Sequence, residues 1–133
     1  MKRFEISKEF LRDAGIAFEN RGYRSCVSRA YYAVFHICIV LFEEYGYQPK
    51  NFIDRSGYPA KRWEHGIVIR YFPLEFVSKR RLFDWKRGIQ LRRLYRTRIE
   101  ADYRVEMEIE EPLVKEILEI AKEIITDIGR RLS

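Results

Sequence analysis

Four side chains of this sequence have the types and spacings that acid–base chemistry needs: Arg29, His36, Arg98 and Tyr103. Arg29 and His36 are seven positions apart, so two helical turns bring them back to nearly the same azimuth. A histidine can transfer a proton near neutral pH, and a fixed guanidinium can stabilise the negative charge that develops on a phosphorane. As candidate catalytic residues, the four predict metal-independent cleavage of RNA, in which the ribose 2′-OH attacks the adjacent phosphate.

Other chemistries match the sequence poorly. The seven glycines form neither G-x-G-x-x-G nor G-K-S/T, the loops that cradle phosphates. His36, His65, Cys26 and Cys38 lack zinc spacing, and no cluster of carboxylates accompanies the two histidines. The serine-hydrolase elbow G-x-S-x-G is also missing from the sequence. We therefore expect neither a metal nor a cofactor.

Charge is distributed unevenly along the chain. Residues 1–49 carry seven basic and six acidic side chains, residues 50–98 fourteen and four, and residues 99–133 five and ten. The balances are +1, +10 and −5, which sum to the formal net charge of +6. A strongly cationic middle third indicates a polyanionic partner, with RNA or a nucleotide first among them. The candidate nucleic-acid-binding residues are cations of the most basic segment: Lys86, Arg87, Arg92, Arg93 and Arg96.

Two other interpretations of these cations stay open. They could form only a solvated face with ion-pair networks, or they could dock an acidic protein in a non-catalytic interaction module. Trp85 could stack on a base, but its helical spacing with Ile89 favours a place in the core. Arg98 and Asp102 are four positions apart, which also fits a structural ion pair on one helix.

Apolar periodicity and end signals predict an all-α fold, an up-and-down bundle of four to five helices, with residues 1–133 as a single domain. Ser7 is expected to cap the first helix, Gly46 to end the second, and Pro73 to follow the end of the third. The helices are expected at about 7–19, 23–45, 62–71, 79–103 and 110–132. Residues 48–60 are expected to form a loop, and residues 105–109 an extended connector rather than a strand.

The second helix is expected at the centre of the bundle. Its apolar stripe is formed by residues at helical spacing: Val27, Tyr31, Val34, Cys38 and Phe42. The opposite face, with Arg29, Ala33, His36 and Val40, is expected to meet a partner subunit or a ligand. Arg29, His36 and Glu43 interrupt the longest apolar run, so no membrane span is expected. Cys26 and Cys38 are expected to be reduced core thiols of a cytoplasmic protein.

The segment Ser28-Arg29-Ala30-Tyr31-Tyr32-Ala33-Val34-Phe35-His36 resembles the signature of a prokaryotic branch of the HEPN family (higher eukaryotes and prokaryotes nucleotide-binding domain). Two further blocks support the resemblance: His65-Gly66-Ile67-Val68-Ile69-Arg70-Tyr71-Phe72, and Leu94-Tyr95 followed by Arg98-Ile99-Glu100-Ala101-Asp102-Tyr103. The resemblance implies a helical bundle that forms a homodimer and is often encoded beside a minimal nucleotidyltransferase in toxin–antitoxin pairs. Many HEPN proteins are metal-independent ribonucleases with an Arg-x4-6-His motif.

The sequence departs from that motif in its fourth helix. Arg98 is followed after four residues by Tyr103, where the resemblance leads one to expect histidine, whereas Arg29 and His36 fit Arg-x6-His on the second helix. A tyrosine with a pKa near 10 is a poor base at neutral pH, although it can donate a hydrogen bond. The sequence therefore favours dimerisation and RNA or nucleotide binding, with an active ribonuclease as the alternative.

Overall fold

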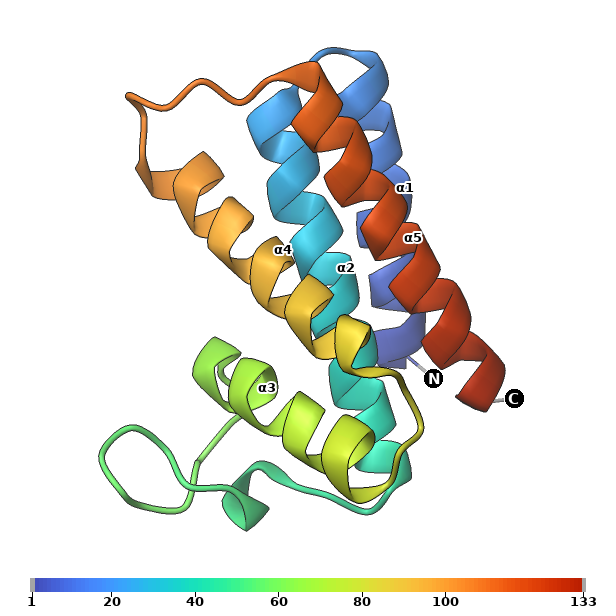
Figure 1. The fold of residues 1–133 in the computed structure, drawn as a ribbon, viewed down its shortest axis with the longest axis vertical. Coiled ribbons are helices and arrows are strands. Elements are labelled where there is room, and N and C mark those ends of the chain that lie inside the picture. The colour runs from blue at the N-terminus through green and yellow to red at the C-terminus, as the bar shows by residue number, and fades with distance from the viewer. Residues whose placement is uncertain (1, 133) are drawn as a thin grey trace.

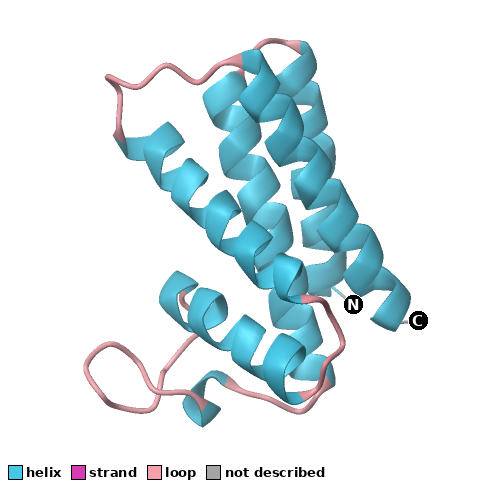
Figure 2. Ribbon diagram, viewed as in Figure 1, coloured by secondary structure: helices cyan, strands magenta, loops and turns pink. Residues whose placement is uncertain are grey.

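The computed structural model describes residues 2–132, and within them the chain is helical apart from its connections. The α-helices are α1 (Lys2–Glu19), α2 (Tyr23–Glu44), α3 (His65–Phe72), α4 (Trp85–Tyr103) and α5 (Glu111–Leu132). A 3₁₀ turn (Pro49–Asn51) and a π-helical segment (Pro73–Lys79) complete them. Figures 1 and 2 show α1, α2, α4 and α5 running up and down as a bundle, with α3 lying across its lower end. The predicted all-α bundle is confirmed.

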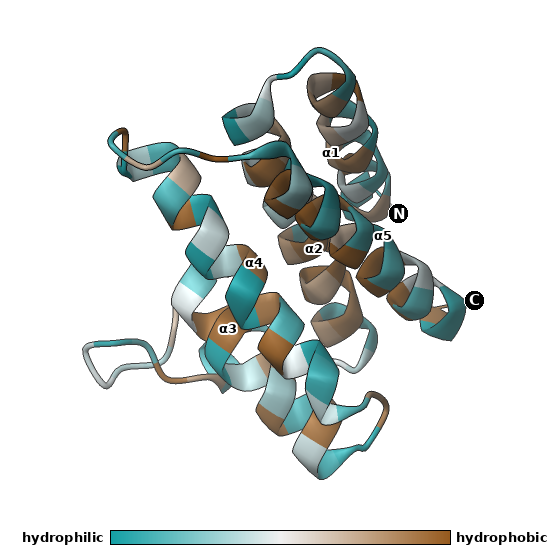
Figure 3. Cartoon of the chain, turned by 45° about the horizontal axis from the view of Figure 1, so that its top comes forward, coloured by the Kyte–Doolittle hydropathy of each residue, from teal (hydrophilic) through white to brown (hydrophobic). Residues whose placement is uncertain are grey.

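Helix α2 forms the centre of the molecule, as its apolar periodicity predicts. It packs against α1, α3, α4 and α5. Tyr31, Cys38 and Phe42 are buried in the common core, where α2 is mainly brown in Figure 3. By length and composition alone α2 could cross a membrane, since its most apolar window has a mean hydropathy of 1.5. However, 72% of that window is buried inside the bundle, and a core helix of this kind passes the same test.

Helix α1 covers most of the second face of α2, where the sequence predicted a partner subunit or a ligand, and leaves Arg29 exposed. Ala33 and Val40 are buried within the monomer, although the sequence suggested that this face is free for another chain. The Ser7 hydroxyl donates a hydrogen bond of 2.6 Å to the Ala33 carbonyl. The prediction that Ser7 caps α1 is therefore wrong: the helix begins before it, and Ser7 lies fully buried in the α1–α2 contact.

The boundaries around α3 and α4 also differ from the predictions. Helix α3 begins at His65 rather than Arg62, and its helical course continues through Pro73 as the π-helical segment. Proline is acceptable there because it lies in the first turn of that segment. Helix α4 begins at Trp85 rather than Lys79, because the Asp84 carboxylate caps it by accepting from the Lys86 backbone N–H at 3.2 Å.

The end of α4 is fixed by a side chain from α2. Arg24 Nη1 donates to the carbonyls of Ala101 (2.8 Å) and Arg104 (3.2 Å), and Nη2 donates to the carbonyl of Met107. These carbonyls lie at the C-terminal end of the helix and in the connector, where backbone acceptors lack helical partners. A cation is also favoured at this end of the helix dipole. Arg24 therefore fixes where α4 stops, and the connector forms no strand, as predicted.

The buried position of Ser7 leads to a stability prediction. Aspartate is as good an N-cap as serine, whereas a buried carboxylate facing a carbonyl oxygen loses its hydration without gaining a donor. Ser7→Asp should therefore lower the free energy of unfolding by more than about 2 kcal/mol. Ser7→Ala should lower it by only about 1 kcal/mol, because a single hydrogen bond is lost. Urea denaturation monitored by circular dichroism measures both. Equal stability of Ser7→Asp and the unmodified chain would contradict the α1–α2 contact.

Candidate functional site at the buried arginine of α4

Arg98 lies buried where α2, α3 and α4 meet, with only 6% of its surface exposed. Its Nη2 donates to the Tyr32 hydroxyl at 2.7 Å and lies 3.2 Å from His65 Nε2. Its guanidinium also lies over the rings of Tyr31 and Tyr32, at 5.4 and 5.2 Å from their centroids. Arg98 is thus held by one hydroxyl and two aromatic faces from α2 and by one imidazole from α3.

The cation at Arg98 is retained in this setting. Burial is the largest single influence and lowers its pKa, but the hydrogen bond from Arg98 to Tyr32 and the nearby Asp102 carboxylate outweigh it, so the pKa is raised overall. Asp102 Oδ2 lies 3.3 Å from Arg98 Nε, an ion pair one helical turn apart that lacks hydrogen-bond geometry. The Ser28 hydroxyl in turn donates to Asp102 at 3.4 Å. The sequence-predicted pair of Arg98 and Asp102 therefore forms.

The contacts of His65 fix its tautomer. A guanidinium only donates, so Nε2 must accept from Arg98 and the ring proton must lie on Nδ1. From there Nδ1–H can donate to the Tyr31 hydroxyl, which lies at 2.8 Å. Burial, followed by the Arg98 charge, lowers the pKa of His65, against a smaller opposing effect of Glu64. His65 is therefore neutral at pH 7 and has the protonation state of a general base.

Two of the four sequence-predicted catalytic residues lie in other surroundings. Arg29 is exposed and donates to the Ser25 hydroxyl one turn earlier on α2. His36 lies between α1 and α2, where Phe10 stacks on its ring at 5.5 Å and Arg3 Nη1 lies 3.1 Å from Nδ1. Burial, then the charge of Arg3, lowers the pKa of His36. Neither residue has a recorded contact with Arg98 within residues 2–132.

Tyr103, the fourth predicted catalytic residue, lies at the end of α4 beside the buried arginine. Its ring centroid is 5.9 Å from the Arg98 guanidinium, and 70% of its surface is exposed. The structure thus brings Arg98 and Tyr103 near one another. It adds His65 and Tyr32, which the chemistry of the sequence alone did not select. The signal that could have found His65 is its position at the head of the second block of the HEPN resemblance.

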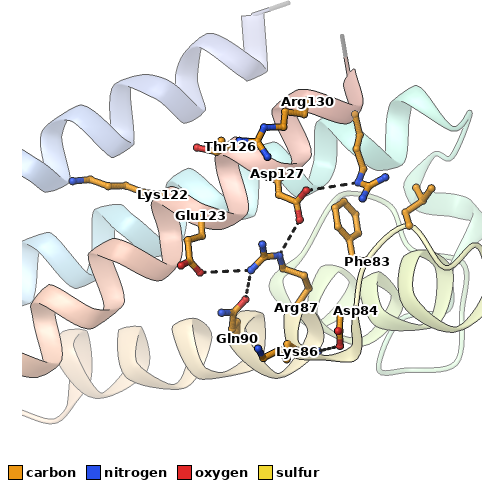
Figure 4. A pocket seen from close by; sticks show the side chains of 12 residues that line it. Phe83, Asp84, Lys86, Arg87, Gln90, Lys122, Glu123, Thr126, Asp127 and Arg130 are labelled. Carbon is orange, nitrogen blue, oxygen red and sulfur yellow. Dashed lines mark hydrogen bonds and ion pairs between the residues drawn. The ribbon is translucent and has the colours of Figure 1, made fainter.

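Four of the five predicted nucleic-acid-binding cations fall into two groups, and Lys86 stands apart from both. Arg87 donates to Asp127 at 3.1 Å and to Gln90 at 2.7 Å, and Figure 4 shows it turned toward Asp127 and Glu123 of α5. Arg93 forms two hydrogen bonds with the Glu116 carboxylate, which raise its pKa. These two arginines neutralise acids of α5. Lys86, which Figure 4 places beside Asp84, is exposed.

The second group, Arg92 and Arg96, has no recorded ion pair within the described part of the chain and is exposed. Both arginines line a hollow on the outer side of α4, together with Trp85 and Ile89. Trp85 is 66% exposed and Ile89 57%, so the expectation that helical spacing places them in the core is wrong. The core side of α4 is occupied by Leu91 and Leu94, which leaves Trp85 on the surface.

The chain is 35% identical over 107 residues to the protein named "Putative toxin MJ0605" of Methanocaldococcus jannaschii, a match that covers 80% of this chain and 69% of that protein. It is 34% identical over 77 residues to "UPF0332 protein PH1297" of Pyrococcus horikoshii, covering 58% of this chain but 45% of that protein. No family model matches the chain.

The fold and site define an all-α bundle with a buried arginine–histidine–tyrosine cluster. The chain belongs to the family of the Methanocaldococcus protein named as a toxin, as the extent and identity of that match show.

The two histidines predict how stability depends on pH. Their folded pKa values are lowered from the ordinary value near 6.5, so below about pH 6.5 the unfolded chain binds more protons than the folded one. The free energy of unfolding should therefore fall as the pH decreases from 7.5 to 5.5. In His65→Gln the decline should be shallower, because the glutamine carbonyl can accept from Arg98 without titrating.

Urea denaturation at several pH values measures this dependence, and His36→Gln provides the parallel case for the α1–α2 histidine. If the free energy of unfolding depends on pH equally in the unmodified chain and in the variant with both substitutions, neither ring is held neutral by the fold.

Proposed function

We propose that this chain is the toxin-side protein of a toxin–antitoxin pair and that it acts in the cytoplasm by binding RNA. The observation that carries the proposal is the hollow on the outer side of α4. There, Arg92 and Arg96 have no recorded acidic partner within residues 2–132, and Trp85 is exposed beside them.

The chemistry of this hollow suits a single-stranded nucleic acid. Guanidinium groups form charge-assisted hydrogen bonds with phosphate oxygens, and an exposed indole can stack on a base. Arg93 also lines the hollow, but it is already paired with Glu116 of α5, so Arg92 and Arg96 are the lining arginines without an acidic partner within residues 2–132. An acidic protein would be attracted by the same charges, but it would give the exposed indole no base on which to stack.

The toxin role rests on the name of the Methanocaldococcus relative and on the resemblance to HEPN proteins. That resemblance adds two partners to the proposal: a minimal nucleotidyltransferase as antitoxin and a second copy of the chain. Because α1 covers the face with Ala33 and Val40, a homodimer would have to use another surface.

RNA binding should depend on Arg92 and Arg96 and on salt. If each meets one phosphate, Arg92→Gln with Arg96→Gln should reduce the slope of log K against log salt by about 1.4 units for a single-stranded RNA. Fluorescence anisotropy of a labelled RNA decamer at several salt concentrations measures the slope. The matched variant, Arg87→Gln with Arg131→Gln, removes the same charge from positions that pair with Asp127 outside the hollow and should change the slope much less, provided that circular dichroism shows it folded.

Equal slopes for the two double variants would contradict the role of the hollow. RNA affinity that does not change with salt would contradict phosphate contacts by these arginines.

A second candidate function, metal-independent RNA cleavage, is favoured by the contact between Arg98 and His65 at 3.2 Å. In this reaction a base removes the 2′-OH proton, the 2′ oxygen bonds to phosphorus, and the 5′ oxygen leaves with a proton, which gives a 2′,3′-cyclic phosphate and a 5′-OH. Neutral His65 would be the base, provided that the substrate displaces Arg98 from Nε2. Arg98 would then stabilise the phosphorane, and Tyr103 would donate a hydrogen bond to the phosphate.

Cleavage that persists in EDTA and leaves cyclic phosphate ends would support this second candidate. His65→Ala should then lower the rate by roughly 10² to 10⁴, whereas His36→Ala, in the α1–α2 contact, should matter much less. Tyr103→His tests whether the α4 position can support cleavage once it carries an imidazole. If no variant cleaves RNA that it binds, binding alone is the function.

A further inference from the structure

A second cationic hollow lies beside His65, on the side of the molecule formed by α3 and the segment that precedes it. Its cavity volume is about 670 Å³, and its lining includes Arg55, Arg62, Arg70, His65 and Trp63. Cavities of this size hold small organic ligands. None of the cations chosen from the sequence lines it, because Arg55, Arg62 and Arg70 are dispersed over a predicted loop and a short helix.

Arg55 is presented by a turn that is fixed by its own hydrogen bonds. The Asp54 carboxylate accepts from the backbone N–H groups of Ser56 (2.9 Å) and Tyr58 (3.0 Å), and Gly57 has the positive φ of 84° that the turn requires. Phe52, at the base of the turn, packs its ring 4.6 Å from Tyr71 of α3. The turn is therefore attached to the core, and Asp54 is already occupied by backbone donors.

The lining of this hollow contains cations that are not paired with an acidic side chain of the described residues. Glu64 forms an ion pair with Arg62 at 3.4 Å. Within residues 2–132, neither Arg55 nor Arg70 has a recorded acidic partner, and Arg70 only lies over the neighbouring Tyr71 ring at 5.2 Å. His65, which also lines the hollow, is neutral and in contact with the buried cation of Arg98. Two unpaired guanidinium groups, with a third cation behind the imidazole, create a site for an anion.

We propose that this hollow binds a phosphate group of a nucleotide or of RNA, with Arg55 and Arg70 as its ligands and the His65 ring beside the phosphate. The partly exposed face of Trp63 lies in the same lining, next to the base or sugar that such a phosphate would carry. The inference deepens the proposed RNA-binding function by giving it a second contact point, but the two sites lie on different residues and can fail separately.

The two tryptophans of the chain make this separation measurable. Trp63 lines the hollow beside His65, and Trp85 lines the hollow on α4. In Trp85→Phe, the fluorescence of Trp63 reports the proposed phosphate site alone. In Trp63→Phe, the fluorescence of Trp85 reports the α4 hollow alone. The probes are inorganic phosphate, 5′-AMP and an unlabelled RNA decamer.

We expect Trp63 fluorescence to change saturably with at least one of these probes. Adding Arg55→Gln and Arg70→Gln to Trp85→Phe should weaken the affinity about 10- to 100-fold, as the loss of two charge-assisted contacts implies. The matched control, Arg12→Gln with Arg130→Gln, removes the same charge from exposed positions on α1 and α5 and should leave the affinity unchanged. Saturation by 5′-AMP or phosphate would assign a free nucleotide phosphate, and saturation by RNA alone would assign a phosphodiester of RNA.

No change in Trp63 fluorescence with any probe would overturn the inference, as would equal affinity in the variant lacking Arg55 and Arg70. A response of Trp85 to RNA in either case would leave the α4 hollow standing as the RNA-binding surface. Circular dichroism of each variant shows whether a lost response reflects unfolding.

Discussion

The burial of the Arg98 charge is the constraint on which the arrangement of α2, α3 and α4 depends. Moving a cation out of water costs several kcal/mol, which is comparable to the free energy of unfolding of a typical small domain. The charge must therefore be compensated where it lies. Tyr32 from α2 accepts its hydrogen bond, His65 from α3 offers a lone pair, and Asp102 supplies the opposite charge. Displacing α2 or α3 would remove one partner and leave the buried guanidinium less compensated. Its position therefore couples the three helices more specifically than apolar contact can.

The same arrangement explains why His65, and not His36, contacts Arg98. His36 lies seven residues after Arg29, but an azimuth shared on one helix only places two residues on the same side. It cannot show that α1 covers His36 through Phe10 and Arg3 while leaving Arg29 in solvent. His65 is 33 positions from Arg98 in sequence and comes into contact with it only because α3 lies across the end of the bundle. Spacing within a helix is thus a weaker guide to a site than the packing between helices.

Sequence patterns predicted the elements well where a single helix face decides the outcome. The stripe from Val27 to Phe42 gave α2 its place at the centre, and Gly46, with a positive φ of 82°, ends it as expected. The patterns gave wrong predictions where residues distant in the sequence determine the position of a side chain. Ser7 has the composition of a cap but is buried against Ala33, which no local signal reveals. Trp85 and Ile89 share a helix face at core-like spacing, yet the core side of α4 is taken by Leu91 and Leu94. For the candidate site, the arginine of α4 and its ion pair with Asp102 could be selected from sequence, but not its contacts with Tyr32 and His65 on other helices.

Which of the positive charges can contact a ligand also depends on the tertiary structure. The middle third of the chain has a balance of +10, but this number does not say which cations can meet a ligand. Arg87 and Arg93 are neutralised by Asp127 and Glu116, which belong to the acidic last third, so part of the charge asymmetry is cancelled inside the fold between α4 and α5. Among the cations of this third that form no ion pair within residues 2–132, Arg92 and Arg96 line one hollow and Arg55 and Arg70 line another. An extended polyanion can meet both groups at once, whereas a single small anion can occupy only one, so the division of the free cations favours RNA over a mononucleotide as the larger partner.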